Sequence, residues 1–239
     1  FLEILQEGLR SRNKGSLIRL ELTEGANKKL IKFLLSHLDL DDNDIYTYKS
    51  LPLNLGSLWQ IVGDKALSHL VLPTFNPKTL PPLDTENILE AIEKQDVLLY
   101  HPYDSFESVV QFINHAAADS ETQAIRMTLP RSGQKSPIVK ALIDAVRDGK
   151  QVMVLVELKA RFDEENNLRW AKALEEAGAH VVYGIPGLKV HAKIAQVIKR
   201  KGKKLQSYVD LAKGNYNPTN SKIYTDIYYF TAKETIKKN

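Results

Sequence analysis

The sequence predicts an α/β protein: a mixed, largely parallel sheet flanked by helices, preceded by part of a smaller α/β domain. Strand-like and helix-like segments alternate regularly from Asp96 onward, and this order implies parallel strands with helices on both faces of the sheet. The proline-rich stretch Pro73–Pro82 is poor helix or central strand, because proline lacks an N–H donor. We therefore expect a domain and connector over residues 1–82 and a second domain over 83–239.

The first part reads as one strand–helix–strand unit. Apolar residues alternate with charged ones in Ser16–Leu22, which predicts a strand. Leucine and isoleucine recur at helical spacing over Leu30–Leu38, and Asp44–Tyr48 follows as a second strand. We expect so small a unit to have little core of its own.

The second part repeats the alternation several times. Strands are predicted over residues 96–100, 123–129, 151–157 and 180–183, and helices over 106–118, 136–149 and 166–177. Asp104 and Glu107 predict a capping box, Ser136 an N-cap, and Gly149 and Gly178 helix ends. The continuous apolar run of 151–157 predicts a strand covered on both faces. Residues 192–210 predict a hairpin that turns at Lys201–Lys203.

Composition excludes several classes of protein. The chain has 239 residues, with 33 Lys+Arg against 29 Asp+Glu, and its 43% hydrophobic and 26% charged residues are typical of a globular protein. It has no cysteine, which excludes disulfide frameworks, Cys-ligated zinc, iron–sulfur clusters and thiol nucleophiles. No apolar run approaches the roughly 18–20 residues of a membrane span. The chain begins at Phe1 rather than Met, and we expect a piece of a longer protein.

Arginines follow two strands of the predicted sheet. Arg131 comes after the second strand of this part and Arg161 after the third. Ligands of α/β sheets bind beyond the carboxyl ends of strands, and guanidinium groups match phosphate oxygens. A surface ion pair of Arg161 with Asp163 or Glu164 is the alternative for one arginine alone. Two arginines at equivalent strand ends favour phosphate binding.

His191 and Lys193 are the sharpest local signal. Residues two apart in a strand share a face, so an imidazole and an ammonium would point at one spot. Imidazole can act as a nucleophile, and lysine can hold a phosphoryl oxygen. An ordinary strand histidine beside a solvated lysine is the alternative. Asn215 and Asn217 could donate hydrogen bonds into the same site or form a simple turn.

A run of basic residues without an acid between them surrounds this signal. Its members are Lys189, Lys193, Lys199, Arg200, Lys201, Lys203 and Lys204. Clustered positive charge attracts polyphosphate, nucleotides or anionic lipid, although a solvated hairpin tip is the alternative.

A series of blocks over Asp96–Asp226, which includes Arg161, His191 and Lys193, closely resembles the bacterial polyphosphate kinase family. The blocks are Leu99–Phe106, Ser136–Val139, Val156–Glu165, Trp170–Gly178, Pro186–Lys193, Gly214–Asn217 and Tyr224–Asp226. Residues 1–95 resemble the family less distinctively. The resemblance implies a phospholipase D-like fold with two related catalytic domains. Residues 1–82 would be part of a head-type domain, and 83–239 the first catalytic domain.

The resemblance also implies an activity. The family reversibly transfers the terminal phosphate of ATP onto polyphosphate through a phosphohistidine. His191 matches the phosphorylated histidine, and Lys193 the lysine two residues after it. Arg131 and Arg161 match a magnesium–phosphate site, where they would contact phosphate oxygens, because a guanidinium has no lone pair for Mg²⁺. Tyr224 matches a nucleotide-contacting tyrosine. The expected cofactor-binding residues are Tyr224, Arg131, Arg161, Asn215 and Asn217.

Partners and location follow from the same resemblance. We expect polyphosphate and ATP or ADP as substrates, Mg²⁺ as cofactor, a second catalytic domain of the same chain, a homo-oligomer when intact, and no specific nucleic acid. The expected location is cytoplasmic, with peripheral attachment to the inner membrane as an alternative. We expect residues 1–239 alone to be inactive.

The chain departs from the family pattern near the site. Pro130 replaces a tyrosine, and Asp210, Ala212 and Lys213 replace His, Gly and a small hydroxyl residue. A phospholipase D-like phosphodiesterase or nuclease is one alternative, although the aspartate that phospholipases place after H-x-K is missing. A polyanion-binding module with weakened catalysis is the other.

Overall fold

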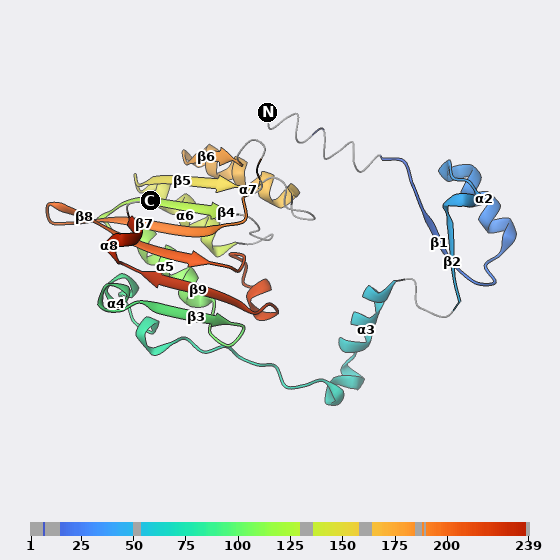
Figure 1. The fold of residues 1–239 in the computed structure, drawn as a ribbon, viewed down its shortest axis with the longest axis horizontal. Helices are drawn as coiled ribbons and strands as arrows, with labels where there is room; N and C mark the ends of the chain where they lie inside the picture. Colours follow the sequence, from blue (N-terminus) through green and yellow to red (C-terminus); the bar gives the residue numbers. More distant parts are fainter. Residues whose placement is uncertain are drawn as a thin grey trace. The chain divides into compact units, whose positions relative to one another are not determined.

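The computed structural model describes residues 7, 15–49, 54–129, 136–157, 164–184, 188 and 190–237. The chain forms two compact units, Phe1–Phe75 and Asn76–Asn239 (Figure 1). Each unit is described by itself.

The first unit is a strand–helix–strand motif followed by short helices. Strand β1 (Leu20–Thr23) pairs in parallel with β2 (Ile45–Tyr48), and helix α2 (Lys28–Leu38) connects them. Asn27 caps α2 by accepting a hydrogen bond from the Lys29 N–H at 2.8 Å. The shorter elements are η1 (Asp42–Asp44), η2 (Leu55–Leu58), α3 (Trp59–Val62) and η3 (Lys65–Leu70).

This unit has little core, as predicted. None of its described residues is buried. Leu30 and Phe33 of α2 are each 55% exposed. A single helix against two strands cannot enclose its apolar side chains.

The second unit is built on a seven-stranded mixed sheet with the order β3-β9-β8-β7-β4-β5-β6. The strands are β3 (Val97–His101), β4 (Thr122–Leu129), β5 (Gln151–Val156), β6 (His180–Tyr183), β7 (Lys193–Lys201), β8 (Lys204–Ala212) and β9 (Asp226–Thr231). The helices are η4 (Pro81–Leu83), α4 (Ile88–Lys94), α5 (Glu107–Ala118), α6 (Pro137–Arg147), α7 (Glu164–Ala177), η5 (Asn220–Lys222) and α8 (Glu234–Lys237). The predicted mixed α/β sheet with flanking helices is confirmed.

The pairing of neighbouring strands is less parallel than the sequence predicts. β4, β5 and β6 are parallel, but the other four pairings in the sheet are antiparallel. The reason is that β7, β8 and β9, which come last in the chain, lie between β3 and β4. The alternation of helices and strands does not reveal this insertion.

The prediction of helices on both faces is also wrong for the described residues. α5 packs against α6 and α6 against α7, so the crossover helices form one layer on one face (Figure 1). Right-handed crossovers that advance in one direction place their helices on the same side of a sheet. The opposite face exposes the apolar side chains Leu98, Tyr100, Met153, Ile194 and Ile227. Because Met153 belongs to β5, the described residues cover this strand on one face only.

Local signals at helix ends are mostly confirmed. Ser136 caps α6 by accepting from the Val139 N–H at 3.3 Å, and Gly149 follows the helix with a φ of 82°. The capping box at Asp104 is wrong, because that carboxylate accepts instead from the Tyr100 N–H at 2.7 Å. Within the described ranges, no helix is long and apolar enough to cross a bilayer.

Candidate active site

Four of the strands bring the candidate residues to one edge of the sheet, which we call the carboxyl edge. β4 and β5 end there, at Leu129 and Val156, and antiparallel β7 begins there. The first residue of β7, Lys193, pairs with Ala212, the last residue of β8. The segments around His191 and after Ala212 therefore lie at the same edge, as ligand-binding segments of α/β sheets commonly do.

His191 and Lys193 meet as predicted, although by a different local structure. β7 begins only at Lys193, so His191 lies just before the strand. The Lys193 Nζ lies 3.0 Å from Nδ1 and 3.1 Å from Nε2 of the His191 ring. The lysine is 2% exposed, whereas the histidine is exposed to solvent. A buried cation thus lies directly beside an accessible imidazole.

The loop Gly214–Asn217 is held by a side chain of β9. The Tyr228 hydroxyl donates to the Asn215 carbonyl at 2.7 Å. The Asn217 side-chain oxygen accepts from the backbone N–H groups of Thr219 and Asn220 at 2.9 and 3.2 Å. Asn217 therefore caps the following turn with its oxygen, which is the simpler of the two interpretations of this segment.

A buried carboxyl group lies under the same loop. Asp210 of β8 is wholly buried, and burial raises its pKa well above the usual value. The Tyr216 hydroxyl, also wholly buried, approaches the carboxyl without reaching ideal hydrogen-bond geometry, and it opposes this shift. Ring contact between Tyr216 and Tyr228, at 5.9 Å, completes the packing. Burial therefore favours the neutral, protonated form of the Asp210 carboxyl group over the ionised form.

Replacing Asp210 with asparagine should change how stability depends on pH. A raised folded-state pKa means that Asp210 stabilises the fold below pH 3.8, and that this contribution is lost as pH rises toward the folded-state pKa. As pH rises above 3.8, the free energy of unfolding of the natural chain should therefore fall relative to that of the Asp210→Asn variant, by up to about 1.4 kcal/mol per pH unit. Urea unfolding followed by Trp170 fluorescence, with Trp59 replaced by Phe, measures this. Asp148→Asn, at an exposed position, is the control. If the free energy of unfolding of the Asp210→Asn variant depended on pH in the same way as that of the natural chain, a raised pKa of Asp210 would be contradicted.

Several predicted site residues lie outside the described residues. Arg131, Arg161 and Lys189 are among them. The strands that precede the two arginines end at the carboxyl edge. Tyr224 lies just before β9 and is 59% exposed.

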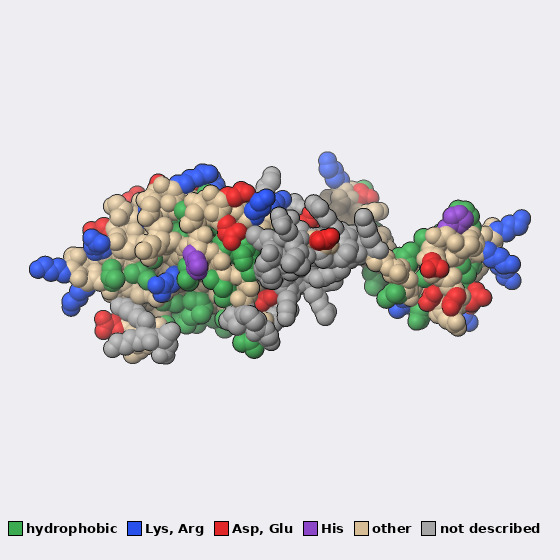
Figure 2. Space-filling view, turned by 90° about the horizontal axis from the view of Figure 1, so that it is seen from above, with side chains coloured by type: hydrophobic (Ala, Val, Ile, Leu, Met, Phe, Trp, Pro, Cys, Tyr) green, Lys and Arg blue, Asp and Glu red, His purple; other side chains and the backbone are tan. Residues whose placement is uncertain are grey.

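The basic run does not form one patch. Lys193 begins β7 at the carboxyl edge, whereas Lys199–Lys204 lie at the far end of the β7–β8 hairpin. Figure 2 shows Lys and Arg side chains projecting at the end of the unit where Figure 1 draws this hairpin. Lys199 pairs with Asp119 and Lys201 with Glu93, both at 2.6 Å. At about 3.3 Å per residue, the two groups of cations are roughly 25 Å apart.

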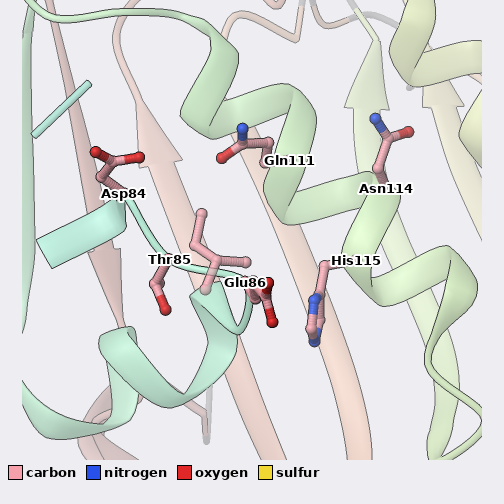
Figure 3. Close-up of a pocket in the computed structure, with 7 residues that line it drawn as sticks. Asp84, Thr85, Glu86, Gln111, Asn114 and His115 are labelled. Atoms are coloured by element: carbon pink, nitrogen blue, oxygen red, sulfur yellow. The ribbon is translucent and has the colours of Figure 1, made fainter. Parts of the chain in front are cut away.

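The candidate residues do not line the described cavities. A cavity of about 490 Å³ lies between the segment before α4 and helix α5 (Figure 3). Its polar lining includes Asp84, Glu86, Gln111, Asn114 and His115. No group of three or more His, Asp or Glu among the described residues could hold a metal ion.

Two further residues at this edge are absent from the sequence-based set. Thr128 and Glu157 each hydrogen-bond to the backbone beside His191. Glu157 follows directly on an apolar strand, and an acid in that position was the available signal. A threonine within a strand carries no such signal.

Known proteins resemble this chain over its whole length. The family model for the polyphosphate kinase C-terminal domain 1 matches residues 87–239, and that for the polyphosphate kinase middle domain matches residues 1–61. A polyphosphate kinase of Campylobacter jejuni (strain 81-176) is 54% identical over 98% of this chain and 34% of its own length. One from Helicobacter pylori (strain J99) is 47% identical over 99% of this chain and 36% of its own.

A solved structure also resembles this chain. The crystal structure of polyphosphate kinase from Porphyromonas gingivalis matches with a TM-score of 0.75 and 31% identity, over 91% of this chain and 33% of that one. The chain thus spans about a third of the length of the relatives it matches. The chain belongs to the polyphosphate kinase family.

Proposed function

We propose that the longer protein containing this chain is a polyphosphate kinase that reversibly transfers the terminal phosphate of ATP to polyphosphate through a phosphohistidine at His191. The contact between His191 and Lys193, 3.0 Å from ring nitrogen to Nζ, carries this proposal. A phosphoryl group on either ring nitrogen would lie beside the ammonium, which would stabilise its oxygens as charge builds in the transition state.

ATP and Mg²⁺ would enter together. Mg²⁺ would be held mainly by the phosphate oxygens of ATP. Arg131 and Arg161 would bind the same oxygens with their guanidinium groups. Mg²⁺ would supply charge neutralisation on the phosphates. Tyr224, exposed at the same edge, would contact the nucleotide. Asn215 and Asn217 would contact the phosphates, Asn217 through its side-chain NH2 group, because its side-chain oxygen caps the following turn.

The remaining partners are part of the proposal. A second catalytic domain of the same longer chain would complete the site at the carboxyl edge, and the intact protein would form a homo-oligomer. Its location would be cytoplasmic, with peripheral attachment to the inner membrane as the alternative. No specific nucleic acid is expected.

Comparing the complete gene product with residues 1–239 tests the proposal. The complete protein should lengthen polyphosphate from ATP and should regenerate ATP from polyphosphate and ADP, while DNA and phospholipid remain uncleaved. Residues 1–239 should show no steady synthesis, because transition-state stabilisation needs all donors in place. Hydrolysis of DNA or phospholipid by the complete protein would favour the phosphodiesterase alternative. Robust synthesis by residues 1–239 would show that no second catalytic half is needed.

A further inference from the structure

The backbone after His191 is held by a side chain of the neighbouring strand. The Thr128 hydroxyl donates to the Ala192 carbonyl at 2.9 Å and accepts from the Ile194 N–H at 3.0 Å. One hydroxyl thus bonds to the residue after His191 and to the residue that follows Lys193.

The hydrogen bonds of Thr128 lie just beyond the end of the regular pairing between β4 and β7. The pairing of β4 with β7 runs only as far as Met127 opposite Ala195. Beyond this pair the backbones no longer exchange ladder hydrogen bonds. The Thr128 side chain supplies one donor and one acceptor in their place.

The backbone before His191 is held by Glu157, the residue that directly follows β5. The Glu157 carboxylate accepts from the Val190 N–H at 2.7 Å. Glu157 is 4% exposed, and its own carbonyl accepts from the Asn167 side chain of α7 at 2.9 Å. A buried, charge-assisted hydrogen bond of this length is strong and directional.

We propose that Thr128 and Glu157 are positioning residues that hold the backbone on both sides of His191 and thereby fix its imidazole against Lys193. This inference rests on the proposed function, because it gives the fixed imidazole its purpose. Neither residue needs to touch ATP or polyphosphate.

The local geometry makes such support necessary. His191 is exposed and precedes β7, so strand pairing does not position it directly. Its partner Lys193 is buried and belongs to the sheet. The ring meets the ammonium only if the short backbone between them is held still. A misplacement of about 1 Å in a reacting group can cost on the order of 10²-fold in rate.

Thr128→Val in the complete gene product separates positioning from folding. Valine keeps the shape of the side chain but removes both hydrogen bonds. We expect kcat for polyphosphate synthesis to fall about 10²-fold, with KM for ATP little changed. Thr128→Ser, which keeps the hydroxyl, should retain most of the activity.

Thr122→Val is the matched control. Thr122 lies on the same strand and is 3% exposed, and its hydroxyl has no hydrogen-bond partner among the described residues. This variant should keep near-normal kcat. A Thr128→Val enzyme that melts normally and turns over as fast as the Thr122→Val enzyme would overturn the inference.

A second readout does not depend on activity. Amide hydrogen exchange at Ile194 should become at least about tenfold faster in Thr128→Val, because its acceptor is lost, while Val197 within the ladder should stay unchanged. Glu157→Gln should similarly speed exchange at Val190, because a neutral amide oxygen accepts more weakly than a carboxylate. If the natural protein forms no phosphohistidine, the proposed function fails. Amide hydrogen exchange at Ile194 and Val190 would then still test whether Thr128 and Glu157 hold the backbone around His191. Unchanged exchange in both variants would refute this role.

Discussion

Replacing His191 with alanine should abolish the labelling of the complete protein by γ-labelled ATP, and polyphosphate synthesis should stop with it. His191 presents an accessible imidazole beside the buried Lys193 ammonium at the carboxyl edge. Alanine leaves no nucleophile to accept the phosphoryl group. The label on the natural protein should be acid-labile and base-stable, as expected of a phosphohistidine, and its loss in the variant is measured by autoradiography after gel separation.

Two other histidines provide controls. His180 is exposed on β6, and His115 lies near the end of α5. Neither is at the start of β7, so alanine at either position should leave labelling near normal. Labelling of the His191→Ala protein at normal yield would sink the assignment and move the search for the acceptor elsewhere.

The second large effect is expected from Gly214→Ala. A Cβ at position 214 would lie 2.7 Å from Asp226 Oδ2 and 2.8 Å from Asp226 Cβ. Asp226 Cβ is fixed by the backbone of β9, so the loop itself has to move. That loop carries Asn215, whose carbonyl accepts a hydrogen bond from the Tyr228 hydroxyl. We expect a fall in kcat of about 10²-fold, with a loss of stability of about 1–3 kcal/mol.

Steady-state kinetics and thermal melting of the complete protein measure both effects. Gly202→Ala is the control, because Gly202 lies at the hairpin tip with a φ of 62° and nothing within 4 Å of its Cβ position. It should cost stability through backbone strain but leave kcat unchanged. Equal losses of kcat in the two variants would show that Gly214 acts through stability alone.

The sequence predicts most individual elements because their signals are local. Alternation over Ser16–Leu22, the proline after Ser136, and the glycines at 149 and 178 depend only on near neighbours. The structure forms elements at these points, although the strand predicted over Ser16–Leu22 begins only at Leu20 and ends at Thr23. The capping box at Asp104 failed because a nearby backbone N–H, that of Tyr100, competes for the same carboxylate.

The arrangement of the sheet could not be predicted in the same way. Strand order depends on which edges meet in space, and β7 to β9 insert between β3 and β4 without any local mark. The same limit applies to the site. His191 and Lys193 are two residues apart and could be paired by spacing, whereas Thr128 is 64 residues from Ala192, the residue it contacts. Register alone creates that contact.

The hairpin of β7 and β8 offers a place to attach a fluorescent label that reports nucleotide binding. Its two strands run in unbroken register from Lys193, beside the imidazole, to Lys201 opposite Lys204 at the tip. Because the chain has no cysteine, a single Lys203→Cys substitution would accept one thiol-reactive dye at a known place. A dye there would lie roughly 25 Å from Lys193, far enough to leave the proposed site undisturbed and within range for energy transfer to a nucleotide bound there. Fluorescence could then follow a dye-labelled nucleotide arriving and leaving in real time.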